Sequence, residues 1–192
     1  MDRKKVKICY LAAEKDSYAK LQELLKNIIL FTFDVEWIQD LGAAEKAAGN
    51  ISVTTDLEEL SRNSDFITEA IVERSEDKRQ LFKRLDTICP PETILASNTS
   101  WLILSDFASE VKRQNKVVIT HYFAPPHIVP GVEVCGGLGT SQETYDLTCS
   151  LMEKTGKIPV RLRKERTGHV INRLQDAMRH DCLLYTSPSP RD

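Results

Sequence analysis

Short apolar runs alternate with amphipathic segments along most of the chain. The runs combine aliphatic and β-branched residues, have the length of β-strands and are bounded by polar or proline-containing stretches. The candidate strands are residues 5–10, 64–72, 92–98, 115–123, 130–136 and 157–163. Near-continuous apolar strands of this kind are typical of a sheet that is buried on both faces.

Helical spacing of apolar residues marks the segments between these runs. In residues 75–88, Leu81, Phe82 and Leu85 fall on one side of the predicted helix. Residues 51–60 are predicted to be a short strand that runs into a helical turn capped by threonine or aspartate. The other predicted helices are residues 16–31, 43–49, 141–156 and 168–180. Strands that alternate with helices predict an α/β fold with a mostly parallel, doubly wound sheet.

A site is indicated by the residues that come immediately after several predicted strands. Glu73, Asn98, Ser100 and His121 each stand just past the end of such a strand. In open parallel sheets, ligands bind and chemistry takes place outside the C-terminal ends of the strands. The sequence therefore predicts that these four side chains belong to one site.

Composition excludes several classes of protein. The 192 residues carry a net charge of −2, so the chain lacks the excess positive charge that is typical of proteins that bind nucleic acid or an anionic membrane. No apolar stretch approaches the roughly 18 residues needed to span a bilayer. The cysteines show no CxxC pair and no metal-ligand spacing, so we expect no metal site and a reducing, cytoplasmic compartment. They are Cys9, Cys89, Cys135, Cys149 and Cys182.

Two features depart from a complete dinucleotide-binding domain. The chain contains no GxGxxG turn, so either no dinucleotide binds or the unit that opens such a domain is absent. Residues 182–192, CLLYTSPSPRD, differ in composition from everything before them and look like the translation of a sequencing adapter. The alternative is a natural disordered tail rich in serine and proline.

Several longer stretches occur in order between Ile51 and Leu174: TTDLEEL, DFITEAIVERSEDKRQLFKRLDTICPPETILASNTS, THYFAPPHIVPGVEV, GTSQET and GHVINRLQDAM. Through them the chain resembles the 3-hydroxyacyl-CoA dehydrogenase family. The resemblance implies a Rossmann-type, NAD-binding domain that here lacks its first strand and phosphate-binding turn. It also implies that the first helix of an all-helical C-terminal domain follows.

This resemblance sets the expected domain limits. Residues 1–165 are expected to be the truncated NAD-binding domain, residues 166–181 the start of the helical domain and residues 182–192 a non-native tail. The chain is then a fragment cut at both ends, and we expect it to be inactive alone. In the family the helical domain covers the substrate and forms the dimer contact, so a homodimer is expected for the full-length parent.

The resemblance also implies a catalytic pair. Oxidation of a secondary alcohol needs a base that is poised near neutral pH, which suits an imidazole. His121 matches the family's catalytic histidine, and Glu133, twelve residues on, matches the carboxylate that holds the other ring nitrogen. Alone, a histidine at a strand end would be read as a core residue, but the adjoining prolines and the glutamate favour the pair. His127 and His169 lack this context and are expected to be ordinary polar or cap residues.

The same resemblance assigns further residues to the site. Ser100 matches a serine that hydrogen-bonds the substrate oxygen and the catalytic histidine, and Asn172 an asparagine that reaches toward the substrate. Asn98 matches an amide that lies beside nicotinamide, and Glu73 and Lys78 match residues on the cofactor side. Without the resemblance, these positions would be read as a turn or helix cap, a solvated helix start and a polar helix position.

The expected reaction leaves alternatives open. The parent is expected to oxidise a (3S)-3-hydroxyacyl-CoA with NAD, or a small 3-hydroxy acid as carnitine and gulonate dehydrogenases do. Ala124 stands where the family usually has an asparagine, which puts the substrate in doubt. A hydrolase triad of Ser100, His121 and Glu133 is a second hypothesis, against which the missing GxSxG elbow counts. A non-catalytic binding protein on the same scaffold is a third.

Overall fold

The computed structural model describes residues 8–12, 54, 56–126 and 128–186. Its strands are β1 (Ile8–Ala12), β2 (Phe66–Ala70), β3 (Ile94–Ser97), β4 (Val117–Tyr122), β5 (Gly131–Gly136) and β6 (Ile158–Leu162). Its helices are α3 (Leu57–Arg62), α4 (Ser75–Ile88), α5 (Leu104–Phe107), α6 (Gln142–Lys154) and α7 (Ile171–Thr186), with a 3₁₀ turn, η1, at Gln114–Lys116.

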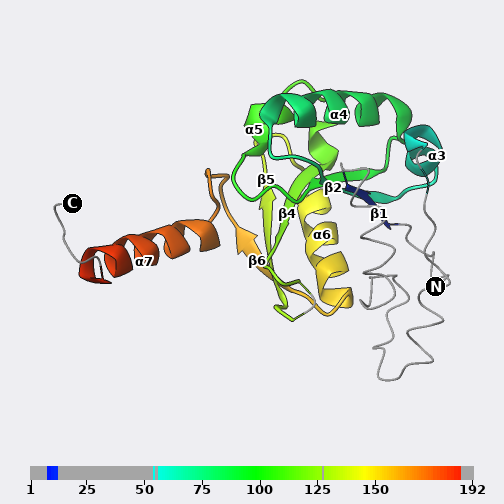
Figure 1. Cartoon of the computed structure of the whole chain (residues 1–192). Helices are drawn as coiled ribbons and strands as arrows, with labels where there is room; N and C mark the ends of the chain where they lie inside the picture. Colours follow the sequence, from blue (N-terminus) through cyan, green and yellow to red (C-terminus); the bar gives the residue numbers. More distant parts are fainter. Residues whose placement is uncertain (1–7, 13–53, 55, 127, 187–192) are drawn as a thin grey trace.

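The described strands form one sheet in the order β1-β2-β3-β4-β5-β6 (Figure 1). Strands β1 to β4 are parallel, β5 is antiparallel to β4, and β6 is parallel to β5. The reversal follows from the short connection after β4, which contains Pro125, Pro126 and Pro130 and is long enough for a turn but not for a crossover helix. The chain therefore returns beside β4 and brings a second strand to its end.

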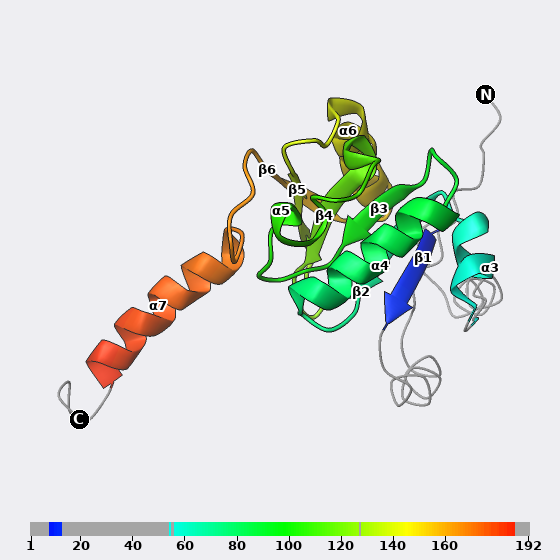
Figure 2. The ribbon, with the colours of Figure 1, turned by 90° about the horizontal axis from the view of Figure 1, so that it is seen from above.

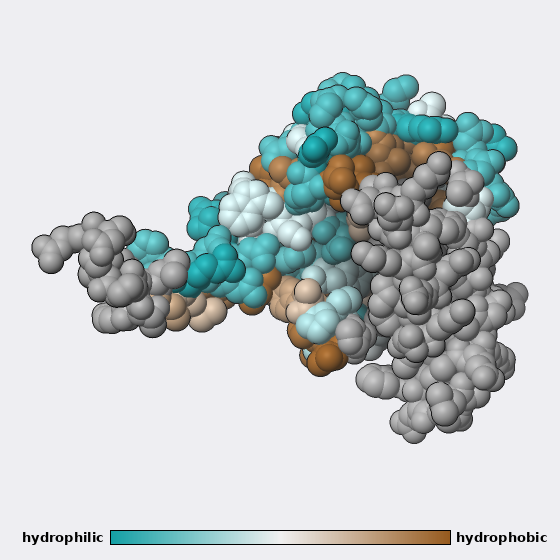
Figure 3. Space-filling model, in the orientation of Figure 1, coloured by the Kyte–Doolittle hydropathy of each residue, from teal (hydrophilic) through white to brown (hydrophobic). Residues whose placement is uncertain are grey.

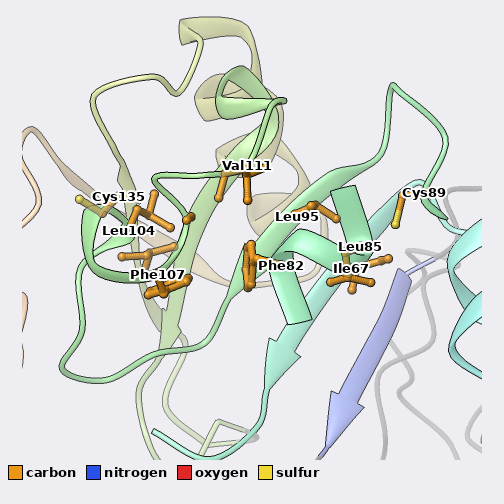
Figure 4. Packing of buried hydrophobic residues seen from close by; sticks show 12 residues of the cluster. Ile67, Phe82, Leu85, Cys89, Leu95, Leu104, Phe107, Val111 and Cys135 are labelled. Atoms are coloured by element: carbon orange, nitrogen blue, oxygen red, sulfur yellow. The ribbon is translucent and has the colours of Figure 1, made fainter. Parts of the chain in front are cut away.

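One face of the sheet packs against α4 and α5. Because side chains alternate along a strand, Ile67, Leu95 and Ile119 point to this face, and all three are fully buried. Figure 4 shows Ile67 and Leu95 in this cluster. Phe82 of α4 and Phe107 of α5 meet edge to face above them, with ring centroids 5.1 Å apart. These aromatic rings fix the two helices to the same part of the sheet.

The other face packs against α6. Phe66, Val118 and Val134 point to this side and contact a cluster that includes Cys149 and Met152 of α6. Seen from above, α4 and α6 lie on opposite sides of the strands (Figure 2). With both faces covered, the prediction of a mostly parallel, doubly wound α/β fold is confirmed.

Helix α4 has the bounds that its sequence pattern predicts. Glu76 and Asp77 occupy its first turn, where acidic side chains interact favourably with the helix dipole. Lys78, Phe82 and Leu85, spaced four and three residues apart, are its buried residues. Two of these are core residues, whereas the buried lysine needs a separate explanation, which the site provides.

Other elements differ from the sequence-based expectations. Asp56 caps α3 as expected, since its side chain accepts hydrogen bonds from the Glu58 and Glu59 amides. The predicted helices at 16–31 and 43–49 and the strand at 51–53 lie outside the described residues. Helix α5 and η1 were not predicted. Helix α7 begins at Ile171, three residues later than expected, and continues through Thr186, past the predicted limit of the helical segment.

Helix α7 extends away from the sheet, with its first turn nearest to the body of the molecule (Figure 1). Leu174 and Met178 are more than half exposed on it. Hydrophilic and apolar residues both appear on its surface, whereas hydrophilic residues dominate the outer face of α4 (Figure 3). Over the described part of the chain, no helix combines the length and apolar character that crossing a bilayer requires.

Candidate active site

His121 and Glu133 occupy facing positions on neighbouring strands. They are register partners in the antiparallel pairing of β4 with β5, so their side chains leave the sheet on the same side. The Nδ1 atom of His121 lies 2.8 Å from Oε2 of Glu133, and both residues are buried. The hairpin that the prolines impose therefore assembles the pair.

The second carboxylate oxygen of Glu133 is held by the start of α7. Its Oε1 accepts hydrogen bonds from the backbone amides of Val170, at 2.9 Å, and Ile171, at 3.0 Å. Burial raises the pKa of Glu133, but the hydrogen bonds from His121 and from these two amides outweigh burial and lower it below the ordinary value of 4.5. Glu133 is therefore a carboxylate at neutral pH.

An ionised Glu133 fixes the tautomer of His121. A carboxylate can only accept hydrogen bonds, so the Nδ1 atom of His121 must carry the hydrogen. In the neutral ring the lone pair then lies on Nε2. This arrangement presents a proton acceptor on one side of the ring and a negative charge on the other, which would stabilise an imidazolium.

Glu73 organises the turn that follows β3. Its Oε1 accepts from the amides of Ser100, at 3.0 Å, and Trp101, at 2.9 Å, and also from the hydroxyl of Thr99. Burial raises the pKa of Glu73, whereas the Thr99 hydroxyl, the Trp101 amide and nearby Lys78 lower it, and the net shift is downward. Glu73 thus acts as an anionic anchor for the SNTS turn.

Lys78 lies behind Glu73 and inside the protein. Its Nζ is 2.6 Å from Oε1 of Glu69 and 3.2 Å from Oε2 of Glu73, and its side chain is only 1% exposed. Ser97 donates a hydrogen bond of 2.6 Å to the other oxygen of Glu69. The buried lysine of α4 is therefore explained by a charge network that links β2, α4 and the turn after β3.

The structure brings the remaining predicted residues to the same end of the sheet. Asn98 accepts a 3.1 Å hydrogen bond from the amide of Tyr122, the residue after His121. Asn172 donates from Nδ2 to the carbonyl of Ser100 at 2.7 Å, which ties α7 to the SNTS turn. Ser100 itself is exposed. In the described part of the chain, no hydrogen bond joins its hydroxyl to His121. The contact expected between this serine and the catalytic histidine is therefore not formed in this arrangement, and neither is the nucleophile–base contact of a hydrolase.

His169 belongs to this cluster, although its sequence context gave no reason to include it. Its ring is 1% exposed and lies 5.2 Å from the ring of His121, centroid to centroid. Its Nε2 is 3.0 Å from the carbonyl oxygen of Thr99. Only the fold, which brings the segment before α7 against the end of β4, reveals this neighbour. The loop residue His127 lies outside the described residues.

The strand ends offer groups that suit a nicotinamide. A flat aromatic ring with a carboxamide needs an apolar surface and a few polar partners. Val72 and Trp101 are exposed by 41% and 46% after β2 and β3, and the amide of Trp101 is bound to Glu73. These residues are compatible with the redox end of a dinucleotide. By contrast, the described residues hold no cluster of His, Cys, Asp and Glu side chains that could bind a metal ion.

Similar proteins share this fold and its sequence. Residues 3–166 match the family model described as the NAD-binding domain of 3-hydroxyacyl-CoA dehydrogenase. The chain is 34% identical over 147 residues to L-carnitine dehydrogenase of Streptomyces griseus, which covers 76% of this chain and 44% of that protein. It is 35% identical over 168 residues to 3-hydroxybutyryl-CoA dehydrogenase of Clostridioides difficile, covering 87% and 58% respectively. The chain thus spans about half the length of these relatives.

Solved structures agree. A diketoreductase matches with a TM-score of 0.81 at 26% identity, over 96% of this chain and 66% of that one. The 3-hydroxybutyryl-CoA dehydrogenase of Escherichia coli matches with a TM-score of 0.72 at 28% identity, over 94% and 39%. NAD is the cofactor of the family these comparisons identify. On its sequence and its fold, the chain belongs to the 3-hydroxyacyl-CoA dehydrogenase family, as a member of its NAD-binding domain.

Proposed function

We propose that the protein oxidises the 3-hydroxyl group of a 3-hydroxyacyl-CoA to the 3-oxo product, with NAD as the hydride acceptor. The single observation that carries this proposal is the 2.8 Å contact between His121 and Glu133 at the end of β4. It supplies a general base of fixed tautomer at the end of a strand, in a domain whose family binds NAD.

The proposed step is proton transfer to His121. Its Nε2 accepts the hydroxyl proton. NAD, when bound at the ends of the strands, would supply the acceptor for the hydride that the same carbon gives up. Glu133 stabilises the resulting imidazolium through Nδ1 and, because two amides hold its other oxygen, keeps its charge and position. In the reverse direction the imidazolium returns the proton to the oxygen of the 3-oxo compound.

The other predicted residues act around this base. Ser100 and Asn172 position the substrate beside His121, and the hydrogen bond between them supports this proposal because it links the turn to α7. Asn98 and Glu73 lie on the cofactor side. The burial of Lys78 favours an indirect role, in which the lysine holds Glu73 and thereby the SNTS turn.

The substrate class is proposed from the names of the relatives. Proteins named for 3-hydroxybutyryl-CoA and for L-carnitine both match at about the same identity. An acyl-CoA is the first choice because further relatives are named for hydroxyacyl-CoA substrates. A small 3-hydroxy acid is the second candidate. We also propose a homodimer, a cytoplasmic location and domain limits near residues 165 and 181 for the whole protein.

The test compares His121→Gln with His180→Gln. Glutamine cannot act as a base near neutral pH, so turnover of NADH with acetoacetyl-CoA should fall by about 10²–10⁴-fold for His121→Gln. His180 is exposed on α7 and serves as the matched control, with turnover unchanged. Because the chain spans about half the length of its relatives, both variants are also made in the complete reading frame that contains it.

Three outcomes decide between the candidates. Turnover of acetoacetyl-CoA that depends on His121 supports the proposal. Turnover of carnitine alone would replace the acyl-CoA by a small hydroxy acid. Binding of NAD by the complete protein without turnover of either compound would contradict the proposed reaction and favour a binding protein. Turnover unaffected by His121→Gln would contradict the proposed base.

A further inference from the structure

His169 is held in an unusual position. Its backbone has φ 49°, in the left-handed region that a bulky residue rarely adopts, and it follows Gly168, which has φ 74°. The next two amides, of Val170 and Ile171, are those that bind Glu133. The strained turn therefore delivers two amides to the carboxylate and one imidazole to the neighbourhood of His121.

One nitrogen of His169 has no partner among the described residues. Its Nδ1 is buried and makes no hydrogen bond within that part of the chain. Its Nε2 contacts the carbonyl of Thr99, which can only accept, so Nε2 carries the hydrogen and Nδ1 bears a lone pair. A buried, unsatisfied acceptor is destabilising, and such groups are rare in folded proteins. The lone pair on Nδ1 of His169 therefore calls for a hydrogen-bond donor from a neighbouring group.

The neighbouring ring, when neutral, also presents an acceptor. Glu133 fixes the hydrogen of His121 on Nδ1, so the Nε2 atom of neutral His121 also bears only a lone pair. The two ring centroids are 5.2 Å apart, and no hydrogen bond joins the rings among the described contacts. Two rings that both present lone pairs cannot bond through these nitrogens, whereas one added proton would supply the missing donor.

We propose that His169 and His121 form an imidazole pair that holds a single proton, in a hydrogen bond from Nε2 of His121 to Nδ1 of His169. This inference rests on the proposed function, in which His121 accepts the substrate proton. His169 is then a positioning residue: it gives the protonated His121 a partner and orients its Nε2. The same bond would retain the proton in the absence of substrate.

The charges around His169 favour one proton over two. The titratable groups that act on it are His121 on β4, Glu133 on β5 and Glu73 after β2, and Lys78 of α4 is paired with Glu73. Burial is the main cause that lowers the pKa of His169 below 6.5, and the charge of a protonated His121 lowers it further. His169 therefore stays neutral while His121 is protonated, as an acceptor must.

The first experiment is an NMR titration of the ¹⁵N-histidine-labelled chain. The ring signals of His121 and His169 should move together in one pH step, because a proton added to the pair changes both rings. His169 should show hydrogen on Nε2 alone at high pH. Independent, single-site curves for the two residues in the wild-type chain would overturn the inference.

Three variants of His169 separate the acceptor from the structural bond. His169→Phe removes both nitrogens, and His169→Gln retains a donor that can reach Thr99 but has no atom at the place of Nδ1. In both, the titration midpoint of His121 should fall by about half a pH unit or more, the shift expected for loss of one hydrogen bond. His169→Asn places an oxygen near the position of Nδ1 and tolerates the left-handed backbone, so the midpoint should stay near its original value.

Controls make each result decisive. His180→Gln should leave the curve of His121 unchanged, and thermal unfolding shows which variants fold. If His169→Phe does not fold, the comparison of Gln with Asn carries the test. Equal His121 midpoints in these two variants would contradict the pair. The titration does not require turnover. If His121 and His169 titrate together but the complete protein oxidises no 3-hydroxy compound, the proposed function is refuted and the histidine pair is not.

Discussion

At the scale of single residues, Glu133 is the centre of the site. It receives three hydrogen bonds, from the Nδ1 of His121 and from the amides of Val170 and Ile171, and it is buried. A buried carboxylate is stable only when such donors replace its hydration. Glu133 therefore depends on β4 and on the start of α7, and any change that moves either element should alter the base.

Part of this site could be predicted from sequence and part could not. The prolines after His121 indicate a turn into a second strand that carries Glu133, the resemblance to the family implies that the two side chains pair, and the structure places them in contact. The amide donors to Glu133 are backbone groups, which carry no residue signature. His169 also escaped prediction, because its place beside His121 depends on a left-handed turn next to Gly168 and not on any motif.

Acid should destabilise the fold in two stages. In the folded protein the pKa of His169 is below 6.5, and the pKa values of Glu133 and Glu73 are below 4.5. Just below pH 6.5 for the histidine, and just below pH 4.5 for the two glutamates, the unfolded chain therefore binds more protons than the folded one. Their stabilising contributions are thus complete above these values and are lost as the pH falls below them. Urea unfolding followed from neutral to acidic pH should show the free energy of unfolding decline first below pH 6.5 and again below pH 4.5.

His169→Phe serves as the control for this prediction. It should weaken the decline that begins below pH 6.5 and leave the one below pH 4.5 in place, because only the first involves this imidazole. A wild-type free energy of unfolding that stays constant between these two pH values would show that His169 is not held neutral by burial.

At the scale of elements, α4 shows how a pattern can predict bounds but not partners. The spacing of Leu81, Phe82 and Leu85 predicts residues 75–88, which are the bounds observed. It does not show that Lys78 belongs to the buried side, since a lysine at the start of a helix is usually solvated. Helix α5 was missed for a different reason: four residues are too few to display a helical period.

Lys78→Met should be strongly destabilising. It leaves Glu69 buried without its positive partner and removes the support of Glu73, so a loss of about 3–5 kcal/mol in the free energy of unfolding is expected. Lys83→Met on the same helix breaks a pair with Glu110 in which both side chains are about half exposed, and should destabilise the protein far less. Urea unfolding of both variants measures the difference. Equal losses would mean that the buried network contributes no more than a surface pair.

At the scale of the molecule, the sheet and α7 differ in how they are held. The sheet is covered on both faces, whereas α7 extends away from it (Figure 1) and exposes Leu174 and Met178. The hydrogen bonds described between α7 and the rest involve its first turn, through Ile171 and Asn172. The strands were predictable because their apolar runs must be buried. The start of α7 was not, because Gly168 and His169 adopt left-handed backbone conformations that break the helix before Ile171.

Hydrogen exchange should reveal this difference. Amides of β4 and β5 should exchange slowest, and those of α7 after Leu174 should exchange faster by several orders of magnitude, because little buried contact supports them. Exchange read out by mass spectrometry on the chain tests this. Protection of residues 174–186 equal to that of β4 would show that another surface covers α7.

The account as a whole depends on the proton of His121 being fixed on Nδ1 by Glu133. Long-range ¹H–¹⁵N NMR of the labelled chain measures this directly. We predict hydrogen on Nδ1 and a bare Nε2 in the neutral ring of the wild type, and the opposite tautomer in Glu133→Gln, whose amide would donate to Nδ1 while its oxygen faces the amides of α7. A wild-type His121 with its hydrogen on Nε2, or a tautomer unaffected by Glu133→Gln, would contradict the assigned base.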